Sequence, residues 1–416
     1  MTLHRRAQGL LRIIAILIAL VGSATAPSVA RAARFPTAAI PISIGSWSNP
    51  SFTESPAPLA TQPWAEAIGP TNSPGPRLGH SAILDTLRRR MLVFGGKYGS
   101  AVLGDLWAYP LDGDTVWQQL PPGPTAPQRF QHIAILDPVR DRMLVYGGLD
   151  SVGARNDVWV YPLSGGGTWS PLAVAGSPPD AQISPCGIYD PIRDRLIVFG
   201  GYANGVLRND VWALSLSGTP TWTRLQPSGL PPEPGMESSA IYDPVRDCMI
   251  LAGGQASGVS HADAWALSLG EQPAWSLLQT HFDVLGRGGH TTVYDPVRDA
   301  IWMYGGAAID SYLYDVWKLS LSGSPTWTTG GPFGVNQVPP RAYHSAILDS
   351  RNDRVIVFGG AGMGSTLGDG WVLQLSTLTW SPLPGTPLAA PAPEFLLDPG
   401  TTSILLGQTL EILVGG

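Results

Sequence analysis

The sequence predicts an all-β fold of the β-propeller type, in which short four-stranded blades surround an axis. A Gly-Gly pair recurs every 52 to 54 residues. In six repeats an Asp lies ten residues before the first Gly, and a Trp lies eleven residues after the second. Such constant spacing indicates repeats that bury their faces against neighbouring repeats. The Asp, first Gly and Trp are Asp85, Gly95 and Trp107; Asp137, Gly147 and Trp159; Asp190, Gly200 and Trp212; Asp243, Gly253 and Trp265; Asp295, Gly305 and Trp317; and Asp349, Gly359 and Trp371.

The third repeat shows why each unit should contain four strands. Residues 187–189 lead into the tight turn expected at Asp190 and Pro191. The continuous apolar run 196–199 predicts a second strand covered on both faces, and a Gly-Gly pair ends it. The runs 211–216 and from Trp222 onward predict a third and a fourth strand. We expect the strand tryptophans to fill the core between blades.

With its Gly-Gly pair after the second strand and its aromatic residues further on, the repeat resembles the Kelch-repeat family. The resemblance covers roughly residues 62–407. The sequence is most similar to secreted bacterial Kelch proteins, whose blade pattern is related to the central domain of galactose oxidase. The resemblance implies a propeller fold, but it does not fix an activity, because one fold supports many functions.

The number of blades depends on how the two ends of the chain are used. Trp64 is spaced like the last-strand tryptophans, although no other strand of its blade is nearby in the sequence. The segments 395–399, 403–407 and 410–414 could supply those strands. We therefore expect seven blades within residues 61–416, with paired N- and C-terminal strands closing the ring and removing open sheet edges. Six blades followed by a degenerate tail is the alternative.

The first 32 residues have the pattern of a secretory signal peptide. Three arginines precede the apolar run 13–21, and small residues precede the expected cut before Ala33. A membrane anchor is the alternative, but this run is short for a bilayer span. Residues 33–60, rich in Pro and Ser, predict a poorly ordered extension. We expect a secreted or periplasmic protein, monomeric and without a membrane span once the leader is removed.

Charge and cysteine content narrow the possible partners. The leader holds four of the 25 basic residues and none of the 31 acidic ones, so the mature charge is 21 minus 31, or −10. This balance argues against a nucleic-acid partner. The two cysteines, Cys186 and Cys248, occupy different positions of adjacent repeats. We therefore expect free thiols and no disulfide.

Antiparallel strands place alternate loops on opposite faces of the ring, and the two faces differ in sequence. On the turn face, which holds the loops between strands one and two, the turns of the DPVRD type hardly vary. On the loop face, which holds the loops between strands two and three and the links between blades, the sequences vary. We expect any ligand there. The candidate ligand-binding residues are Tyr98, Tyr202, Tyr312, Tyr314, Arg155 and Arg208 in the loops, and Arg77, Arg129, Arg287 and Arg341 in the links.

Tyrosine offers a flat apolar ring with one hydroxyl, and arginine offers a fork of donors, so the set suits stacking on sugars or holding an acidic group. The alternative is that the four link arginines only tie blades together. Each of these arginines begins an Arg-x-x-His pattern, with His80, His132, His290 and His344. Repetition around an axis favours a structural hydrogen bond to the backbone at the blade junction. We expect no metal and no cofactor.

We expect a non-catalytic module that presents its loop face to a protein or carbohydrate ligand. Similarity to periplasmic Kelch-type sialate epimerases implies an alternative, a sugar-modifying enzyme with an acid or base among Glu233, Glu237, His261 and Asp310. A surface scaffold without a small ligand is the third possibility. Tyr343 and His344 are similar to a copper-ligand segment of galactose oxidase, but the corresponding position in an earlier repeat is Glu237 instead of Tyr, so copper-radical chemistry is not expected.

Overall fold

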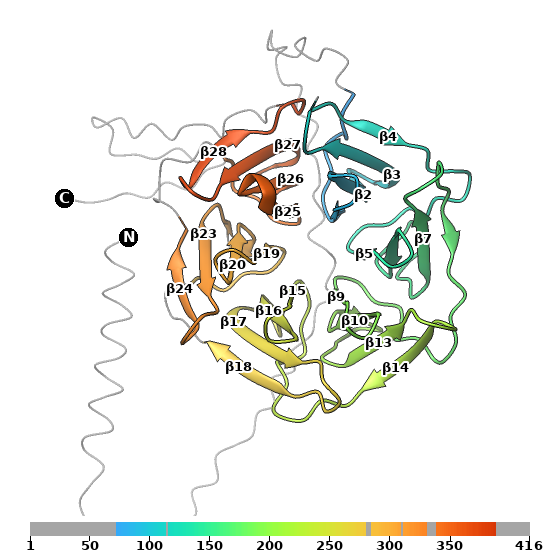
Figure 1. Ribbon diagram of the computed structural model, residues 1–416, viewed down its shortest axis with the longest axis vertical. Helices are drawn as coiled ribbons and strands as arrows, with labels where there is room; N and C mark the ends of the chain where they lie inside the picture. The colour runs from blue at the N-terminus through green and yellow to red at the C-terminus, as the bar shows by residue number, and fades with distance from the viewer. Residues whose placement is uncertain (1–71, 114, 280–283, 309–310, 331–337, 388–416) are drawn as a thin grey trace, which may run out of the picture. The chain divides into compact units, whose positions relative to one another are not determined.

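The computed structural model describes residues 72–113, 115–279, 284–308, 311–330 and 338–387. These residues form six four-stranded antiparallel sheets arranged around an axis (Figure 1). Each sheet is built from strands that follow one another along the chain. This confirms the all-β propeller with four-stranded blades. The leader at 1–32 and the extension at 33–60 lie outside the described residues.

Blades 1 to 3 occupy the first half of the ring. Blade 1 contains β1 (Ser81–Asp85), β2 (Arg90–Tyr98), β3 (Ala101–Pro110) and β4 (Gln118–Leu120). Blade 2 contains β5 (Ile133–Asp137), β6 (Arg142–Tyr146), β7 (Val158–Pro162) and β8 (Ser170–Pro171). Blade 3 contains β9 (Cys186–Asp190), β10 (Arg195–Phe199), β13 (Val211–Ser215) and β14 (Thr221–Leu225), with a small hairpin of β11 (Tyr202–Ala203) and β12 (Val206–Leu207).

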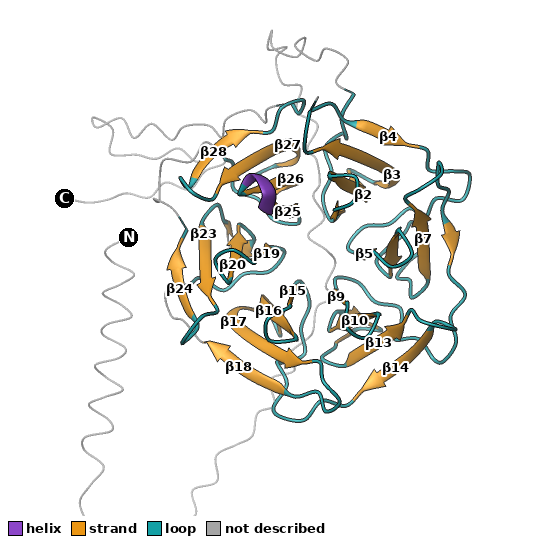
Figure 2. Cartoon of the chain, in the orientation of Figure 1, coloured by secondary structure: helices purple, strands orange, loops and turns teal. Residues whose placement is uncertain are grey.

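Blades 4 to 6 complete the ring. Blade 4 contains β15 (Ser239–Asp243), β16 (Cys248–Ala256), β17 (Val259–Ser268) and β18 (Trp275–Gln279). Blade 5 contains β19 (Thr291–Asp295), β20 (Ala300–Tyr304), β23 (Val316–Ser320) and β24 (Thr326–Thr329), with a hairpin of β21 (Ala307–Ala308) and β22 (Ser311–Tyr312). Blade 6 contains β25 (Ser345–Asp349), β26 (Arg354–Gly362), β27 (Ser365–Gln374) and β28 (Thr379–Pro382). A helical turn, η1 (Ser350–Asn352), joins β25 to β26 and is coloured purple in Figure 2.

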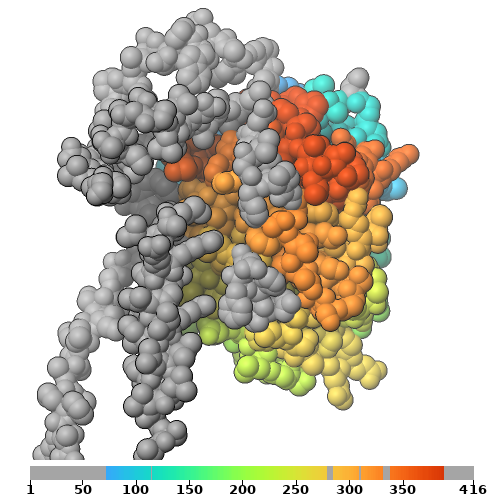
Figure 3. Space-filling model, turned by 90° about the vertical axis from the view of Figure 1, so that its left-hand side faces the viewer, coloured from blue at the N-terminus to red at the C-terminus, as the bar shows by residue number. Residues whose placement is uncertain are grey.

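The core lies between blades. Second strands are apolar on both faces, as in β2, where Met91, Leu92, Val93 and Phe94 are all fully buried. The hydrophobic residues form six clusters, and each cluster joins two consecutive blades. In the space-filling view the blades lie against one another in chain order, from yellow to red (Figure 3). Burial of apolar surface at these junctions is therefore the main force that holds the ring together.

The strand tryptophans contribute to this core to different degrees. Trp107, Trp317 and Trp371 are buried. Trp159, Trp212 and Trp265 are half-buried and pack against the edge of a cluster. Each of the three buried ones donates its indole N–H to the carboxylate two residues earlier. The repeated Asp before Trp is thus an acceptor for an indole.

The Gly-Gly pair is required where neighbouring blades touch. Gly95 and Gly96 have φ values of +65° and +102°. The N–H of Gly96 donates to the carbonyl of Arg129 in blade 2 at 2.7 Å. A Cβ on Gly95 would lie 2.5 Å from that carbonyl oxygen, which no side chain could tolerate. Glycine is therefore needed both for the left-handed backbone and for the close approach of the next blade.

The ring closes directly between blade 6 and blade 1, which corrects the expectation of seven blades. One hydrophobic cluster combines Met91 and Val93 of blade 1 with Ile356 and Phe358 of blade 6. The N–H of Gly360 in blade 6 also donates to the carbonyl of Arg77 in blade 1. A blade built from both termini has no place at this junction, and the segments 395–399, 403–407 and 410–414 lie outside the described residues. The described residues thus form six blades, the alternative that the sequence left open.

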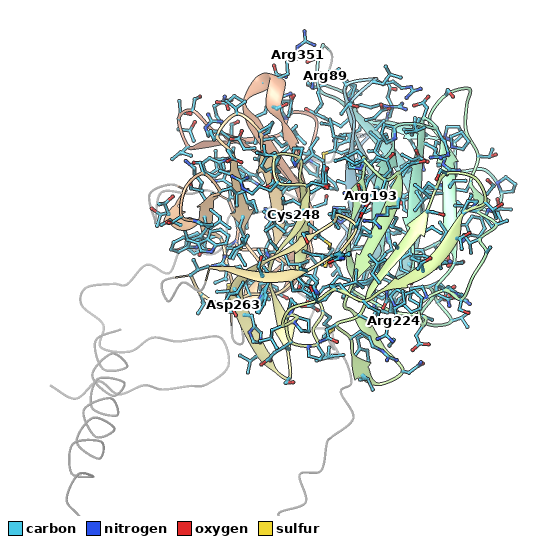
Figure 4. The ribbon with its side chains drawn as sticks, turned by 60° about the horizontal axis from the view of Figure 1, so that its bottom comes forward. Arg89, Arg193, Arg224, Cys248, Asp263 and Arg351 are labelled. Atoms are coloured by element: carbon cyan, nitrogen blue, oxygen red, sulfur yellow. The ribbon has the colours of Figure 1, made fainter. Side chains whose placement is uncertain are left out.

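On the turn face, ion pairs join each blade to the next, and five of the six junctions have a bidentate pair. The arginine of one turn pairs with the aspartate of the following turn in five junctions: Arg88 with Asp141, Arg140 with Asp194, Arg193 with Asp247, Arg246 with Asp299, and Arg298 with Asp353. The sixth junction differs, because Asn352 stands at the arginine position of blade 6. Arg89 occupies the aspartate position of blade 1 and pairs with the buried Asp349 of blade 6 at 2.8 Å. Arg89 and Arg351 lie near each other at this junction (Figure 4).

Candidate functional site at the axial mouth

Six residues, one from each link, form a closed ring of backbone hydrogen bonds on the loop face. Each residue lies just before the first strand of its blade, and its N–H donates to the carbonyl of the equivalent residue in the preceding blade at 2.7–3.2 Å. Because the ring passes through all six blades, it surrounds the axis. We call these residues the axial residues. They are Gly79, Gln131, Ser184, Glu237, Gly289 and Tyr343.

All six axial residues have left-handed backbone conformations. The φ values lie between +51° and +63°. For Gln131, Ser184, Glu237 and Tyr343 this conformation costs roughly 1–3 kcal/mol each relative to an ordinary backbone. Non-glycine residues in such conformations are often found at functional sites, where the surrounding structure holds them. The four side chains differ from one another, so the axial ring combines a uniform backbone with a varied set of polar groups.

Two of these side chains meet although they come from blades 4 and 6. The hydroxyl of Tyr343 donates to Oε1 of Glu237 at 3.0 Å. Burial raises the pKa of Glu237 from 4.5 to about 7, although the hydrogen bond from Tyr343 acts in the opposite direction. Burial and the nearby Glu237 charge raise the pKa of Tyr343 as well. Burial and the same charge raise the pKa of Tyr312, in the hairpin of blade 5.

The contact between Tyr343 and Glu237 is possible because blade 5 has two glycines, Gly288 and Gly289, at the point where the two side chains meet. A Cβ on Gly288 would lie 2.7 Å from Oε2 of Glu237. A Cβ on Gly289 would lie 2.9 Å from the ring of Tyr343. The side chain of Gln255 also approaches this point. Oε2 of Glu237 is buried and has no hydrogen-bond partner among the described residues. The site therefore contains one carboxyl oxygen without a hydrogen-bond partner in the described part of the chain, on a residue that is itself half-buried.

The four link arginines are placed differently from the expected ligand-binding role. Arg77, Arg129, Arg287 and Arg341 are buried, and each pairs with an aspartate 28 residues later in its own blade. Each also donates to the carbonyl of the first glycine of the Gly-Gly pair. The guanidiniums thus tie the link to strands two and three within one blade, and we do not include them in the proposed site.

The two loop arginines also have carboxylate partners. Arg155 pairs with Asp150 in the same loop of blade 2 at 2.6 Å. Arg208 pairs with Asp180 at 2.5 Å, and both side chains are partly exposed to solvent. Surface pairs of this kind contribute little free energy, so a ligand could displace either partner at low cost.

The loop tyrosines lie at the rim of the loop face. Tyr98 is 54% exposed and Tyr314 is 41% exposed, whereas Tyr202 and Tyr312 are half-buried. The hairpin tips of the other blades carry exposed apolar residues that were not singled out from the sequence. They are Val152, Val206, Val259 and Met363. Each blade therefore presents at least one exposed apolar side chain on this face, with Tyr98 in blade 1 and Tyr314 in blade 5, and the links add Leu230 and Leu285.

The repeated histidines lie at blade junctions, where His80, His290 and His344 interact with backbone groups of the preceding blade, as expected. Three of the histidines also bond to hydroxyls. Nε2 of His132 lies 2.8 Å from Oγ of Ser81 in the preceding blade. His80 and His344 make equivalent contacts with Ser345 and Thr291. Burial lowers the pKa of His132 to about 3, so its imidazole is neutral. Among the described residues, no group of three or more possible metal ligands comes together.

The remaining candidates for acid–base chemistry are less well placed than Glu237. Glu233 is largely exposed, and its Oε2 lies 3.8 Å from Nε2 of His261. Asp310 lies outside the described residues. Cys186 and Cys248 are both free and buried, and burial raises their thiol pKa values to about 12. Within the described residues, no helix is long and apolar enough to cross a bilayer.

Comparison with known proteins places this architecture in a family. The model of the KLHDC2/KLHL20/DRC7 Kelch-repeats domain matches residues 57–254 and 244–397. The chain therefore belongs to the Kelch-repeat family, whose propellers are generally protein-interaction modules. A solved structure described as "Structure of YjhT" matches with a TM-score of 0.59, over 75% of this chain and 98% of that chain, at 15% identity. At this identity the match shows the fold alone.

Several curated proteins are similar in sequence. The chain is 27% identical to the dynein alpha chain of the flagellar outer arm from Chlamydomonas reinhardtii, over 82% of this chain and 8% of that protein. It is 28% identical to an F-box/kelch-repeat protein from Arabidopsis thaliana, over 69% of this chain and 66% of the relative. It is 26% identical to Kelch domain-containing protein 1 from Mus musculus, over 64% of this chain and 71% of the relative. The chain thus spans less than two thirds of the first two relatives.

Proposed function

We propose that the chain is a non-catalytic binding module that holds a protein segment on its loop face. The observation that carries this proposal is the rim of exposed apolar side chains, at least one from each blade, around the polar axial ring. Interfaces typically combine apolar anchors with polar groups that set orientation. The turn face also exposes aliphatic residues, such as Val139 and Val297. There, however, the neighbouring arginines and aspartates already neutralise one another, and the sequence hardly changes between blades.

A selection for binding peptides tests this proposal. The purified full chain is used to select from a random peptide library displayed on phage, and the affinities of the enriched peptides are then measured. We expect Val152→Asp and Met363→Asp to weaken these peptides about tenfold or more, as for anchor residues at interfaces. Val139→Asp and Val297→Asp are matched controls on the turn face and should leave affinity unchanged. Equal losses on both faces, or losses only in the controls, would contradict the proposal.

We further propose that this module is exported, which rests on the sequence pattern of residues 1–32, and that it is a monomer. Mass spectrometry of protein exported by a bacterial host should give an N-terminus near Ala33. Recovery of the intact leader on the exported protein would contradict this part of the proposal. Light scattering of the same sample should give the mass of one chain.

A sugar-modifying enzyme is a second candidate, and a glycan ligand would use the same face. The observation in its favour is Glu237, since a carboxyl with a pKa of about 7 can both donate and accept a proton near neutral pH. Anomer interconversion of N-acetylneuraminic acid and D-galactose, followed by proton NMR, tests this candidate. A rate increase that is lost in Glu237→Gln would establish catalysis. The same rate with and without the wild-type protein would reject catalysis for these sugars.

A further inference from the structure

We propose that the site formed by Glu237 and Tyr343 in the axial ring binds a primary ammonium group, such as a lysine side chain or a chain N-terminus. Oε2 of Glu237 would be its counter-ion. This inference rests on the proposed binding function and names the chemistry that the loop face recognises. It also reverses the prediction of a site for an acidic ligand. The four link arginines expected to hold such a group are buried inside the blades and paired with aspartates.

The first step concerns charge compensation. Among the described residues, no arginine, lysine or histidine forms a hydrogen bond or an ion pair with Glu237, and its one bonded partner is the neutral hydroxyl of Tyr343. A buried carboxylate without a cation is unfavourable, and it is relieved either by taking up a proton or by a positive partner. A cationic ligand would therefore gain attraction from a charge that the protein leaves uncompensated.

The second step concerns geometry. Tyr343 occupies Oε1, so one carboxylate oxygen is left for a ligand. A guanidinium binds best through two parallel hydrogen bonds to both oxygens. An ammonium is a compact point charge and can be served by a single oxygen. The available oxygen therefore favours an ammonium over a guanidinium.

The third step concerns the surroundings of this oxygen. Gly288 and Gly289 remove side-chain bulk beside Glu237 and Tyr343. The hydroxyl of Tyr343 donates to Glu237, and Tyr312 lies near enough for the Glu237 charge to raise its pKa. The side chain of Gln255 adds a neutral polar group at the same point. Within the part of the chain that the structure describes, the site thus combines one unpartnered carboxyl oxygen, two nearby tyrosines and no cation bonded to Glu237.

A small-molecule titration tests the inference without any protein partner. The full chain is labelled with ¹³C at glutamate carboxyl groups, and the Glu237 signal is assigned by its loss in Glu237→Gln. n-Butylammonium, n-butylguanidinium and n-butanol are the probes. We expect saturable shifts of the Glu237 signal with n-butylammonium, a pKa of Glu237 lowered by about one unit at saturation, and roughly tenfold weaker binding of n-butylguanidinium. n-Butanol should give no saturable shift.

Variants separate recognition from a change in stability. Glu237→Gln should abolish n-butylammonium binding, as followed by ligand-observed NMR, while Glu233→Gln should leave it unchanged. Thermal unfolding of each variant shows that the fold persists. Equal responses to n-butylammonium and n-butanol, or undiminished binding in Glu237→Gln, would overturn the inference. If n-butylammonium does not bind but the peptide selection succeeds, the ammonium site is rejected and the binding module is kept. If n-butylammonium binds but the peptide selection fails, only the binding module is rejected.

Discussion

At the scale of single residues, Glu237 determines the electrostatics of the loop face. Its pKa is raised from 4.5 to about 7 because the folded protein buries it without a cation. In the unfolded chain the same carboxyl should titrate near its ordinary value. Between pH 4.5 and 7 the folded protein therefore binds more protons at this site than the unfolded chain. The stability that Glu237 contributes is accordingly greatest at acidic pH and is lost as pH rises through this window.

The direction of this pH dependence gives a first prediction. The free energy of unfolding of the wild type, minus that of Glu237→Gln, should fall by about 3 kcal/mol between pH 5 and pH 8. Urea denaturation of both proteins at four pH values measures this difference. The comparison also removes the contribution of His80, His132 and His290, whose pKa values are lowered to about 3 and which oppose the trend below pH 6.5. A difference that stays constant with pH would show that Glu237 titrates normally.

The link arginines give a second prediction at this scale. Arg341 and Asp369 are both fully buried and share two hydrogen bonds of 3.0 and 2.8 Å. Arg341→Ala should lower the free energy of unfolding by about 3–5 kcal/mol, because it leaves a buried carboxylate without its partner. Arg224→Ala, which removes a solvent-exposed side chain 3.8 Å from Asp210, should cost less than about 1 kcal/mol. Similar losses in both variants, measured by urea denaturation, would argue against the structural role of Arg341.

At the scale of elements, the links before the first strands carry strain that ordinary strands do not. Gln131 has a φ of +55°, a conformation that glycine adopts without penalty. Gln131→Gly should therefore leave stability unchanged or raise it by about 0.5–1 kcal/mol. Gln119→Gly, in the exposed strand β4, should instead lower stability by about 0.5–1 kcal/mol. Thermal unfolding distinguishes the two, and a marked loss in Gln131→Gly would mean that its side chain stabilises the axial ring.

The links also show what the sequence could and could not predict. Strand positions follow from the apolar runs and the Gly-Gly pairs, because these depend on local patterns. No one type of side chain marks the axial residues. Residues as different as Gly79, Ser184 and Tyr343 take the same backbone conformation. That conformation is imposed by hydrogen bonds between blades. Glu237 and Tyr343 were each considered from the sequence, but their contact across blade 5 depends on Gly288 and Gly289, whose significance appears only once the ring is assembled.

At the scale of the whole molecule, the number of blades depends on a contact that no single repeat specifies. Five junctions repeat the same Arg–Asp pair, and the sixth replaces it by Arg89 and Asp349. This replacement marks the place where the first and last described blades meet. The repeats alone are compatible with either six or seven blades, because blade width and closure are set by packing between neighbours. The direct junction of blades 6 and 1 therefore decides the number.

Closure without the C-terminal segment gives the last prediction. A chain that ends at residue 387 keeps β28 and the buried Leu383, so all six junctions remain complete. Its thermal unfolding midpoint should differ from that of the full chain by less than about 2 °C. A chain that ends at residue 378 is the matched control. It loses β28 and Leu383, opens a sheet edge, and should unfold several degrees lower. A large loss already on removal of residues 388–416 would mean that these residues stabilise the ring, as the seven-blade arrangement required.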